Sequence, residues 1–586
     1  MADEKKLLYG VSDFAELRAR NGWFVDRTDK IRALAGIPFA LFLRPRRFGK
    51  SLLVSILQCY YDIAYADRFS ELFAETKIGL APTDEQGSYL VLSFNFSAVD
   101  KRPGAVQESF NEFTSLWIDK FAERYGKIMP DGAAEAIRSA KDCGSKLNIL
   151  AAKMQGSGRK ICVLVDEYDN FTNTILAEDG ERAYHDLCHG DGFFKQFFTQ
   201  LKAAATGTDA PVARIFVTGV SPVTMDDVTS GFNIATDISK DPAFADFVGF
   251  TKEDLSEMLS YFSRRENRKF DPDSIAGNLV EWGGGYSFAK SGTPKLLNTT
   301  VVLGAMRTVL ETGGFPGDPV DVNIKTDYAK IRHLVTIGRR LNGNFHLLES
   351  ILEQGGCTVR LSDTFQAREL AKPDHFASLL YYFGLLSVAE ERLDQVNLAI
   401  PNRMVSEFLH GFVPSAYSDV HDVDPRLSEI SGNMTKFALN GDFGPVLDSL
   451  ASLVGEYFSV RDAVKGERVV QTAVCSLLYV AHGPFAIRHE REENGGFTDI
   501  EIQPLTSFYP QIRHAAILEL KYLRKTDDGS QAALEKILDD AALQLSDYAK
   551  DKNLAATWSL APAGSVTLHR IVLVFQGGDL VLRREV

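Results

Sequence analysis

The sequence predicts an α/β protein with a helix-covered sheet in its first half and a second α/β domain near its C-terminal end. Near-continuous apolar runs, as expected of strands in a parallel sheet covered on both faces, lie at 39–43, 89–96, 160–166 and 213–221. Apolar positions with helical spacing follow the first run, so residues 39–57 have the pattern of strand, loop and helix. The run at 515–523 alternates between apolar and charged side chains, as a strand does.

The length and composition limit the class of protein. A chain of 586 residues is too long for one hydrophobic core and predicts three or four domains. Its 45% hydrophobic and 24% charged residues are typical of a globular protein. No run reaches the roughly 18 apolar residues of a membrane-spanning helix, and no apolar segment of a signal peptide follows the charged first residues. We therefore expect a cytoplasmic location and no membrane partner.

Cysteine spacing and net charge exclude two further classes. The six cysteines are scattered singly without a C-x-x-C pair, which predicts reduced thiols and no zinc site. A net charge of −14 argues against a protein that coats nucleic acid without sequence preference. A local basic groove is still compatible with an acidic whole.

The loop after the first apolar run carries a phosphate-binding pattern. It ends in Gly49-Lys50-Ser51, the second half of a loop that holds phosphates with backbone N–H groups and a helix N-terminus. In that role Lys50 reaches the β and γ phosphates and Ser51 binds Mg²⁺. The strict G-x-x-x-x-G-K-[ST] pattern has a glycine where this chain has Arg44. An ordinary strand-to-helix turn is the alternative, so a second nucleotide motif is needed.

The strand at 160–166 supplies this second motif. It ends in Asp166-Glu167, about 115 residues after Ser51. A buried strand can deliver a carboxylate to the shell of Mg²⁺, and the next carboxylate can orient the attacking water. We therefore predict Asp166 as the metal-shell residue and Glu167 as the residue that polarises water. A strand ending in a solvated acidic turn is the alternative for this motif taken alone.

Three other segments are expected around a nucleotide. The strand at 213–221 ends in hydroxyl residues, so Thr218 or Ser221 is a candidate sensor of the γ phosphate, with a capped turn as the alternative. Residues 9–35 either pack over an adenine base or complete the core. A helical segment begins at the N-cap Thr251 and forms a lid. Its basic cluster at 264–269 either supplies an arginine to a second copy in a homo-oligomer or is a solvated helix end.

The middle of the chain changes character after a linker at 314–319. Residues 376–401 read as a helix, a glycine, a short strand, a charged turn and a second strand, which is the pattern of a winged-helix-like module. Such modules bind DNA in some proteins and join domains in others. We favour the joining role here.

The last part of the chain contains a second acidic constellation. Residues 488–492 read as an acidic helix, Gly496-Phe497-Thr498-Asp499 follows, and Glu519 and Lys521 share one face of the later strand because side chains alternate. Asp499 and Glu519 can hold one or two Mg²⁺ ions, and Lys521 can position the water that attacks a phosphodiester. A solvated Glu–Lys ion pair is the alternative.

With both constellations in view, the chain resembles a bacterial and archaeal family over nearly its full length. That family joins an AAA-ATPase-like N-terminal domain to a C-terminal PD-(D/E)xK nuclease-superfamily domain. The resemblance is carried by Val25-Asp26-Arg27-Thr28, Arg44-Pro45-Arg46-Arg47-Phe48-Gly49-Lys50-Ser51-Leu52, Val165-Asp166-Glu167-Tyr168-Asp169, Thr218-Gly219-Val220-Ser221-Pro222, 381–387 with Ile400-Pro401-Asn402, and Asp499 with Glu519-Leu520-Lys521. The loop containing Arg44 is itself typical of the family.

The resemblance implies a fold and a set of site residues. The implied fold is a three-layer P-loop ATPase core at 1–250, a helical lid at 251–315, a winged-helix-like connector at 316–425 and a restriction-endonuclease-like domain at 426–586. ATP and Mg²⁺ or Mn²⁺ are the implied cofactors. The implied nucleotide residues are Arg47, Gly49, Lys50, Ser51, Asp166, Glu167, Thr218 and Ser221. The implied nuclease residues are Glu490 or Glu492, Asp499, Glu519 and Lys521, with Gln544 and Tyr548 in support. The arginine usual two residues before the metal aspartate is Phe497 here.

Two functions follow from these patterns. In the first, ATP binding or hydrolysis gates metal-dependent cleavage of DNA, with defence against phage or mobile DNA as an implication of the resemblance. In the second, the protein is a nucleotide-switched regulatory or binding protein with an inactive nuclease fold. From residue 431 onward the chain has 16 Lys plus Arg against 20 Asp plus Glu, so DNA needs a locally basic groove and an RNA substrate stays open.

Overall fold

The computed structural model describes most of the chain as two compact units. The described residues are 4–102, 104–178, 184, 187–188, 192–228, 233–265, 270–289, 293–320, 343–363, 365–366, 369, 372–421, 424–459, 467–493, 496–506, 509–548, 550, 552–560 and 564–586. One unit comprises 1–333 and 358–403, and the other comprises 334–357 and 404–586. Within the described ranges, every helix is too short or too polar to cross a bilayer.

The first unit is organised around a parallel sheet of five strands. They are β1 (Phe39–Leu43), β2 (Tyr89–Asn95), β3 (Lys160–Asp166), β4 (Val212–Gly219) and β5 (Thr236–Asp237). The spatial order is β2-β3-β4-β1-β5, so β4 lies between the two strands that end in the nucleotide motifs. Val217 of β4 pairs with Leu41 on one side and with Val165 on the other. All carboxyl ends therefore meet at one edge, where ligands bind in open α/β sheets.

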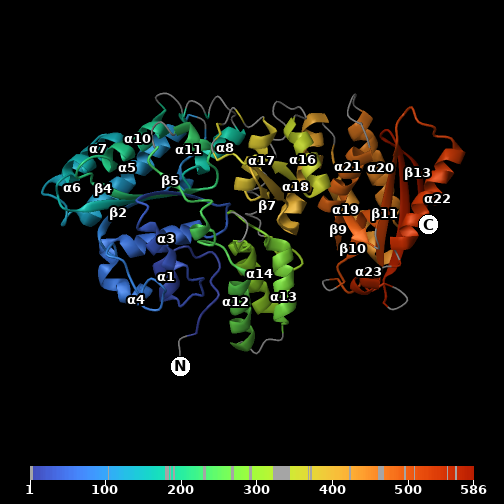
Figure 1. Ribbon diagram of the computed structural model, residues 1–586, viewed down its shortest axis with the longest axis horizontal. Coiled ribbons are helices and arrows are strands. Elements are labelled where there is room, and N and C mark those ends of the chain that lie inside the picture. The colour runs from blue at the N-terminus through green and yellow to red at the C-terminus, as the bar shows by residue number, and fades with distance from the viewer. Residues whose placement is uncertain are drawn as a thin grey trace. The chain divides into compact units, whose positions relative to one another are not determined.

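Helices cover both faces of this sheet, which confirms the predicted three-layer arrangement. Figure 1 shows α5, α7 and α10 on one side and α1, α3 and α4 on the other. The bounds are α1 (Phe14–Ala19), α2 (Ile31–Leu34), α3 (Lys50–Tyr61), α4 (Phe69–Phe73), α5 (Val106–Tyr125), α6 (Ala133–Arg138), α7 (Cys143–Met154), α8 (Asn170–Glu178), α10 (Phe193–Ala205) and α11 (Val223–Val228), with short 3-10 helices at Thr28–Lys30, Ile63–Arg68, Phe96–Ala98 and Pro242–Phe244. Helix α3 begins at Lys50, directly after the loop, because Leu53, Val54 and Leu57 bury its apolar face.

Three helices form the predicted lid, and a small module follows it. The lid helices are α12 (Lys252–Arg265), α13 (Pro272–Gly283) and α14 (Thr299–Thr312). The module contains α17 (Pro373–Tyr382) and the antiparallel hairpin β7 (Ser387–Arg392) and β8 (Gln395–Ala399). The hairpin belongs to a three-stranded sheet of order β6-β8-β7, in which β6 is Gly356–Val359. Helix α17 buries residues 376–382 in succession, so the part of it left exposed to read a DNA groove is limited to its first turn at 373–375.

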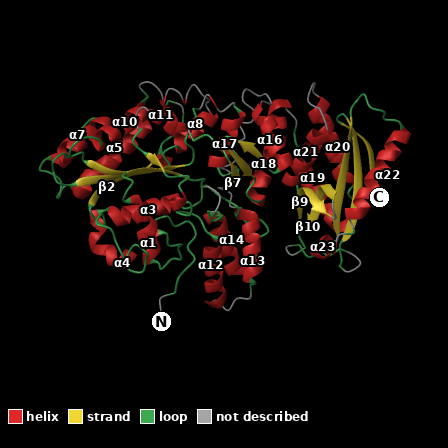
Figure 2. Ribbon diagram, in the orientation of Figure 1, coloured by secondary structure: helices red, strands yellow, loops and turns green. Residues whose placement is uncertain are grey.

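The second unit is a mixed sheet between helices. Its strands are β9 (Phe485–Glu493), β10 (Gly496–Pro504), β11 (His514–Leu523), β12 (Thr567–Gln576) and β13 (Asp579–Glu585), in the order β13-β12-β11-β10-β9, and only β11 and β12 are parallel. The helices are α16 (Gly343–Gln354), α18 (Arg403–His421), α19 (Leu427–Asn440), α20 (Gly444–Ser459), α21 (Glu467–Val480), α22 (Gln531–Tyr548) and α23 (Lys552–Thr557). Figure 2 shows these strands as one yellow group flanked by helices. Helix α22 packs on the face that carries Ala515 and Ile517.

The prediction of an acidic helix at 488–492 is wrong, because these residues lie in strand β9. Phe485 pairs with Pro504 and the antiparallel register continues to the pair Glu493 and Gly496. Apolar Phe485 and Ile487 are buried, and charged residues follow them. β9 is an edge strand of its sheet, and charged side chains are common on such edges because they oppose pairing with other chains.

Candidate nucleotide and metal sites

The loop between β1 and α3 brings Lys50 and Ser51 to the carboxyl edge of the parallel sheet. Arg47 and Gly49 have positive φ angles of +70° and +102°, so the backbone bends sharply before the helix begins. The Lys50 Nζ atom donates to the carbonyl oxygens of Arg44 and Pro45, each at 2.9 Å. Burial lowers the pKa of Lys50, and the carboxylates of Glu167 and Asp166 oppose this shift. The ammonium group is thus held at the loop and faces the acidic residues.

Arg44 occupies the position of the missing glycine and is turned into the protein. Its guanidinium is almost fully buried and donates to the carbonyls of Leu43 (2.8 Å), Ser239 (2.6 Å), Phe244 (3.1 Å) and Ala245 (3.3 Å). It also lies over the rings of Phe42 and Phe288, at 4.4 and 4.8 Å from their centroids. Burial lowers its pKa to about 10. The buried Arg44 side chain therefore anchors the loop to the protein interior.

Asp166 joins the two sequence motifs. The Ser51 hydroxyl donates to Asp166 Oδ2 at 2.7 Å, and the amide of Asn95 at the end of β2 donates to the same oxygen at 3.1 Å. The carboxyl group is buried, which raises its pKa, and the bond from Ser51 partly offsets this. A serine hydroxyl beside a buried carboxylate is a donor set that suits Mg²⁺.

Glu167 follows in a strained backbone conformation. Its φ of +50° lies in the left-handed region, which is uncommon for residues other than glycine. The Asn170 Nδ2 atom donates to Glu167 Oε2, and both residues line the pocket beside Lys50. Asp169 accepts from the backbone N–H groups of Val220 and Ser221 (2.8–3.1 Å), which ties this turn to the end of β4.

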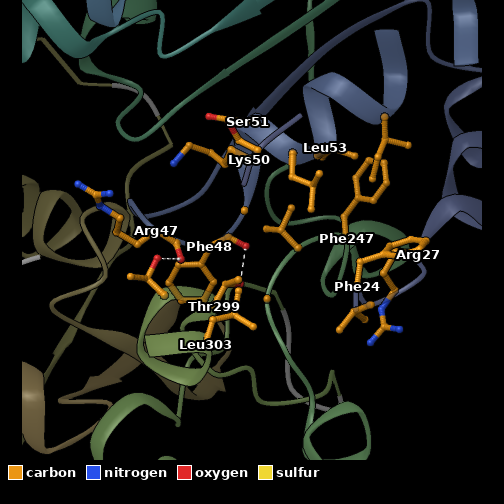
Figure 3. Close-up of a pocket in the computed structure, with 18 of the residues that line it drawn as sticks. Phe24, Arg27, Arg47, Phe48, Lys50, Ser51, Leu53, Phe247, Thr299 and Leu303 are labelled. Carbon is orange, nitrogen blue, oxygen red and sulfur yellow. Dashed lines mark hydrogen bonds between the residues drawn. The ribbon is translucent and has the colours of Figure 1, made fainter. Parts of the chain in front are cut away.

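A pocket of about 450 Å³ opens in front of Lys50 and Ser51. Its walls are mainly apolar and come from 8–31, α3, 247–250 and α14. Figure 3 shows Lys50 and Ser51 at one end, Phe24 and Phe247 on a second wall, and Thr299 and Leu303 on a third. The N-terminal segment therefore lines the pocket, as one of its two expected roles requires. The volume and the mixture of an apolar wall with a charged end suit a nucleotide.

The lid is hydrogen-bonded to the loop. Asn298 caps α14 by accepting from the N–H groups of Thr300 and Val301, at 3.0 and 3.3 Å. The first residues of α14 then donate to loop carbonyls, with Thr299 Oγ1 to Phe48 O at 2.8 Å and Thr300 N to Arg47 O at 3.2 Å. The N-terminus of lid helix α14 is thus hydrogen-bonded to the loop that precedes α3.

The second unit brings Asp499, Glu519 and Lys521 together. Ile500 of β10 pairs with Leu518 of β11. Because the strands are antiparallel, the neighbouring pair in this register is Asp499 and Glu519, whose side chains lie on the same face of the sheet. Lys521 Nζ donates to Glu519 Oε1 at 2.7 Å. Asp499 Oδ2 accepts from the N–H of Leu520 at 2.7 Å, and its Oδ1 accepts from Gln471 Nε2 of α21 at 3.0 Å. Two carboxylates on one side of a sheet with an adjacent ammonium suit a divalent ion.

Comparisons with known proteins match both regions. A family model described as "Predicted AAA-ATPase" matches residues 8–229, and one described as "PD-(D/E)XK nuclease superfamily" matches residues 465–585. This chain joins an AAA-ATPase domain to a PD-(D/E)XK nuclease-superfamily domain. The resemblance inferred from the sequence is confirmed.

A curated relative of this chain comes from Azotobacter chroococcum mcd 1. It is named as an uncharacterized protein in the vnfD 5′ region and is 26% identical over 301 residues, which are 48% of this chain and 49% of the relative. The chain therefore spans about half the length of the curated relative it matches.

Two predicted residues of the AAA-ATPase domain have structural partners outside the pocket. The Thr218 hydroxyl donates to the Phe42 carbonyl at 2.8 Å inside the sheet, and the Ser221 hydroxyl accepts from the Val223 N–H at 3.2 Å. Neither residue lines the pocket. Their role as γ-phosphate sensors stays a prediction that these contacts do not support. In the basic cluster, Arg264 donates to the Ser260 carbonyl, and 266–269 lie outside the described residues.

In the nuclease-superfamily domain, the side chains of Glu490 and Glu492 lie outside the described residues. Gln544 is exposed on α22, and Tyr548 is buried in the core beneath that helix. Within the part of the chain that the structure describes, three or more His, Cys, Asp or Glu side chains do not converge on a metal position. Of the predicted metal ligands in this domain, the structure therefore describes the carboxylates of Asp499 and Glu519.

Gln471 is a site residue that the sequence patterns missed. It is buried on α21 and its amide holds Asp499. The stretch 469–480 is apolar with helical spacing, which signals the helix. Nothing in the pattern distinguishes Gln471 from any other polar residue of that helix, because its role depends on a contact with a strand 28 residues away.

Proposed function

We propose that the protein binds and hydrolyses ATP and that its nucleotide state gates metal-dependent cleavage of DNA by the nuclease-superfamily domain. The observation that carries the ATP part is the contact of Ser51 with Asp166, with Lys50 and Glu167 beside it at the charged end of the pocket. A phosphate-loop hydroxyl and an acidic strand end meet in this way to bind a nucleotide with Mg²⁺. The biological setting that fits is defence against phage or mobile DNA.

Each residue of the ATP site has a defined task. Lys50 exchanges the carbonyls of Arg44 and Pro45 for the β and γ phosphates. Ser51 and Asp166 are the residues that would hold Mg²⁺, which would neutralise charge on the phosphates. Glu167 accepts a proton from the attacking water. The apolar wall of the pocket takes the base and ribose, and Thr299 keeps the lid on the loop.

The gating begins with contacts between the loop and the winged-helix-like module. A Cβ atom on Gly384 (φ +75°) would lie 2.7 Å from the Pro45 ring, and one on Gly285 would lie 2.1 Å from the Pro401 carbonyl oxygen, so glycine is required at both close approaches. The Tyr381 hydroxyl donates to the Phe288 carbonyl at 2.8 Å. When Lys50 leaves the Pro45 carbonyl for a phosphate, the module is therefore in direct contact with the residue that is released.

Further contacts tie the module to the loop at 284–288. Ser387 Oγ accepts from the Ser287 N–H at 2.7 Å, and Asn402 Nδ2 donates to the Gly284 carbonyl at 2.7 Å. The buried residues of α17 and the acidic hairpin support the proposal that this module joins domains and does not read DNA. The chain passes into the second unit within α18, after Arg403, which is one of the covalent connections between the two units.

The nuclease step uses the pair of carboxylates on β10 and β11. Asp499 and Glu519 are the residues that would hold Mg²⁺ or Mn²⁺, which would stabilise charge on the scissile phosphate. Lys521, at 2.7 Å from Glu519, orients the attacking water. The Leu520 N–H and Gln471 fix the Asp499 carboxylate for this task.

The ATP part is tested with two variants of the full chain. Lys50→Ala removes the phosphate contact and should weaken ATP binding at least about tenfold, because a charge-assisted hydrogen bond contributes roughly 1.5–3 kcal/mol. Glu167→Gln should retain ATP binding and lose hydrolysis. Binding is measured with a fluorescent ATP analogue and hydrolysis by phosphate release. ATP binding that Lys50→Ala leaves unchanged would contradict the assignment.

The nuclease part is tested with Glu519→Ala and with Lys521→Ala. Both should abolish Mg²⁺-dependent cleavage of DNA while ATP hydrolysis continues. Cleavage of single-stranded DNA, double-stranded DNA and RNA is compared with and without ATP. Cleavage by Glu519→Ala at the wild-type rate would refute the catalytic assignment.

The second candidate function is a nucleotide-switched regulator with an inactive nuclease fold. Two observations favour it: Phe497 replaces the usual arginine, and both oxygens of Asp499 already accept hydrogen bonds from the protein. ATP-dependent assembly into a homo-oligomer without cleavage of any nucleic acid, in Mg²⁺ or Mn²⁺, would support this function over the first.

A further inference from the structure

Asn170 is a buried polar residue at the ATP site to which neither sequence motif gives a task. It is the first residue of α8, is 8% exposed, and lines the pocket beside Glu167. Its Nδ2 atom donates to Glu167 Oε2. The other end of the amide, Oδ1, is buried and has no hydrogen-bond partner among the described residues.

A buried acceptor without a donor is unusual and informative. Leaving such a group unpaired costs roughly 1–3 kcal/mol, and most buried polar atoms in native proteins are paired. The amide is fixed in this orientation, because turning it over would place Oδ1 against the Glu167 carboxylate. Because Asn170 lines the pocket beside Glu167, a donor bound there would supply the hydrogen bond that Oδ1 lacks.

The attacking water is a donor of the required kind. It carries two O–H groups, and alignment of its oxygen on the γ phosphorus requires an acceptor for each of them. Glu167 Oε2 is engaged by Asn170, which leaves Oε1 for one proton. We propose that Asn170 Oδ1 accepts the second O–H of the attacking water, so that Glu167 and Asn170 together orient the nucleophile of ATP hydrolysis.

The reaction balances with these two acceptors. The water oxygen bonds to the γ phosphorus while the bond from that phosphorus to the β,γ-bridging oxygen breaks, and ADP leaves with the electron pair. One proton of the water passes to Glu167 Oε1 and then to solvent. The other proton remains on the new phosphate, and its O–H is still donated to Asn170 Oδ1. The products are ADP, inorganic phosphate and one proton.

The inference rests on the proposed function, since it requires that ATP be hydrolysed at this pocket. A purely structural role for Asn170 is the competing explanation, in which its amide only holds the strained Glu167 turn. The two differ in what they predict for binding and for rate. A structural role changes nucleotide affinity or stability, whereas an acceptor for the attacking water changes the rate of the bound complex.

The test uses Asn170→Leu and Asn170→Ser in the full chain. The first keeps the volume without polar atoms, and the second has a hydroxyl too short to reach both partners, so a loss common to both reports the amide. We expect kcat for ATP hydrolysis to fall at least about tenfold, the scale on which partners of a reacting group act. The Kd for a fluorescent ATP analogue should stay within about twofold, which also shows that the variants are folded. Asn111→Ala, which removes the amide that caps the Cys143 N–H, is the matched control and should keep the wild-type kcat.

A double-mutant cycle supplies the decisive readout. In the Glu167→Gln background, the slow residual hydrolysis measured in single turnovers should differ less than about twofold between Asn170 and Asn170→Ser, because the two acceptors act on the same water. An undiminished tenfold loss in that background, or a wild-type kcat in both single variants, would overturn the inference. A wild-type protein that binds ATP and never hydrolyses it would instead overturn the proposed function on which the inference depends.

Discussion

Replacing Arg44 tests how this residue supports the proposed phosphate-binding loop, in which it occupies the position of the first glycine. Arg44→Gly restores the strict motif, and Arg44→Leu keeps most of the buried volume. In both variants the carbonyls of Leu43, Ser239, Phe244 and Ala245 lose a charged donor inside the protein. Two ring contacts, with Phe42 and Phe288, are lost as well. We expect the loop to lose its anchor and ATP binding to weaken, although the motif has become more regular.

The magnitude follows from these contacts. Hydrogen bonds from a charged group contribute roughly 1.5–3 kcal/mol each and are not additive, and a cation–π contact adds roughly 0.5–1 kcal/mol. The desolvation that lowers the pKa of Arg44 to about 10 offsets part of this sum. The net loss should resemble that of removing one partner from a buried charged network, roughly 3–5 kcal/mol.

The assay must report on the first unit alone, because a chain with two compact units does not unfold in one step. Hydrogen exchange of β1 and β5, measured by mass spectrometry, gives the local free energy of opening. Arg32→Leu is the matched control, since Arg32 is exposed and makes one bond to the Ala81 carbonyl. Protection of β1 in Arg44→Leu within about 0.5 kcal/mol of the control would refute the reasoning, as would tighter ATP binding by Arg44→Gly.

Three further predictions follow from the site contacts. Tyr381→Phe removes the hydrogen bond to the Phe288 carbonyl and should lower the stimulation of DNA cleavage by ATP by roughly 2–10-fold. Tyr382→Phe is the control, because it removes a buried hydroxyl without a partner among the described residues and should leave the stimulation unchanged. Cleavage rates with and without ATP give the stimulation of each variant. Gln471→Ala removes the hydrogen bond that orients Asp499 Oδ1 and should raise the Mg²⁺ concentration for half-maximal cleavage by about tenfold, measured by metal titration. Burial and His569 lower the pKa of His514, so the unfolded chain binds more protons at this residue than the folded chain does. The free energy of unfolding should therefore fall as the pH drops below about 6.5. His514→Gln should reduce this fall, measured by urea denaturation at about pH 7.5 and 5.5.

The sequence predicted the strands and the nucleotide motif where the signal is local. Polar residues lie at or directly after the ends of β1, β3 and β4, and parallel pairing brings such ends to one edge whatever the rest of the chain does. The meeting of Ser51 and Asp166 follows from that geometry alone. Glu519 and Lys521 likewise share a face because strand side chains alternate.

The remaining features depend on distant partners that no local pattern encodes. Residues 488–492 are charged enough for a helix surface, and only pairing with β10 makes them a strand. Arg44 breaks a motif in the sequence, and its anchoring role appears only with the carbonyls of 239–245 beneath it. Thr218 lies at the expected strand end, but its hydroxyl turns to the neighbouring strand. Such orientations are decided by register and tertiary contacts.

The position of β4 between β1 and β3 has a consequence for biosynthesis. Residues 39–51 and 160–167 are translated well before residues 212–219, yet β1 has no sheet neighbour and β3 has only β2 until the later segment arrives. A nascent chain that stops short of β4 therefore carries both halves of its ATP pocket without the spacer that sets them apart. A bound nucleotide therefore stabilises the fold only after more than a third of the polypeptide has left the ribosome. Until then, the apolar edges of β1 and β3 that pair with β4 are exposed, where they can bind chaperones or aggregate.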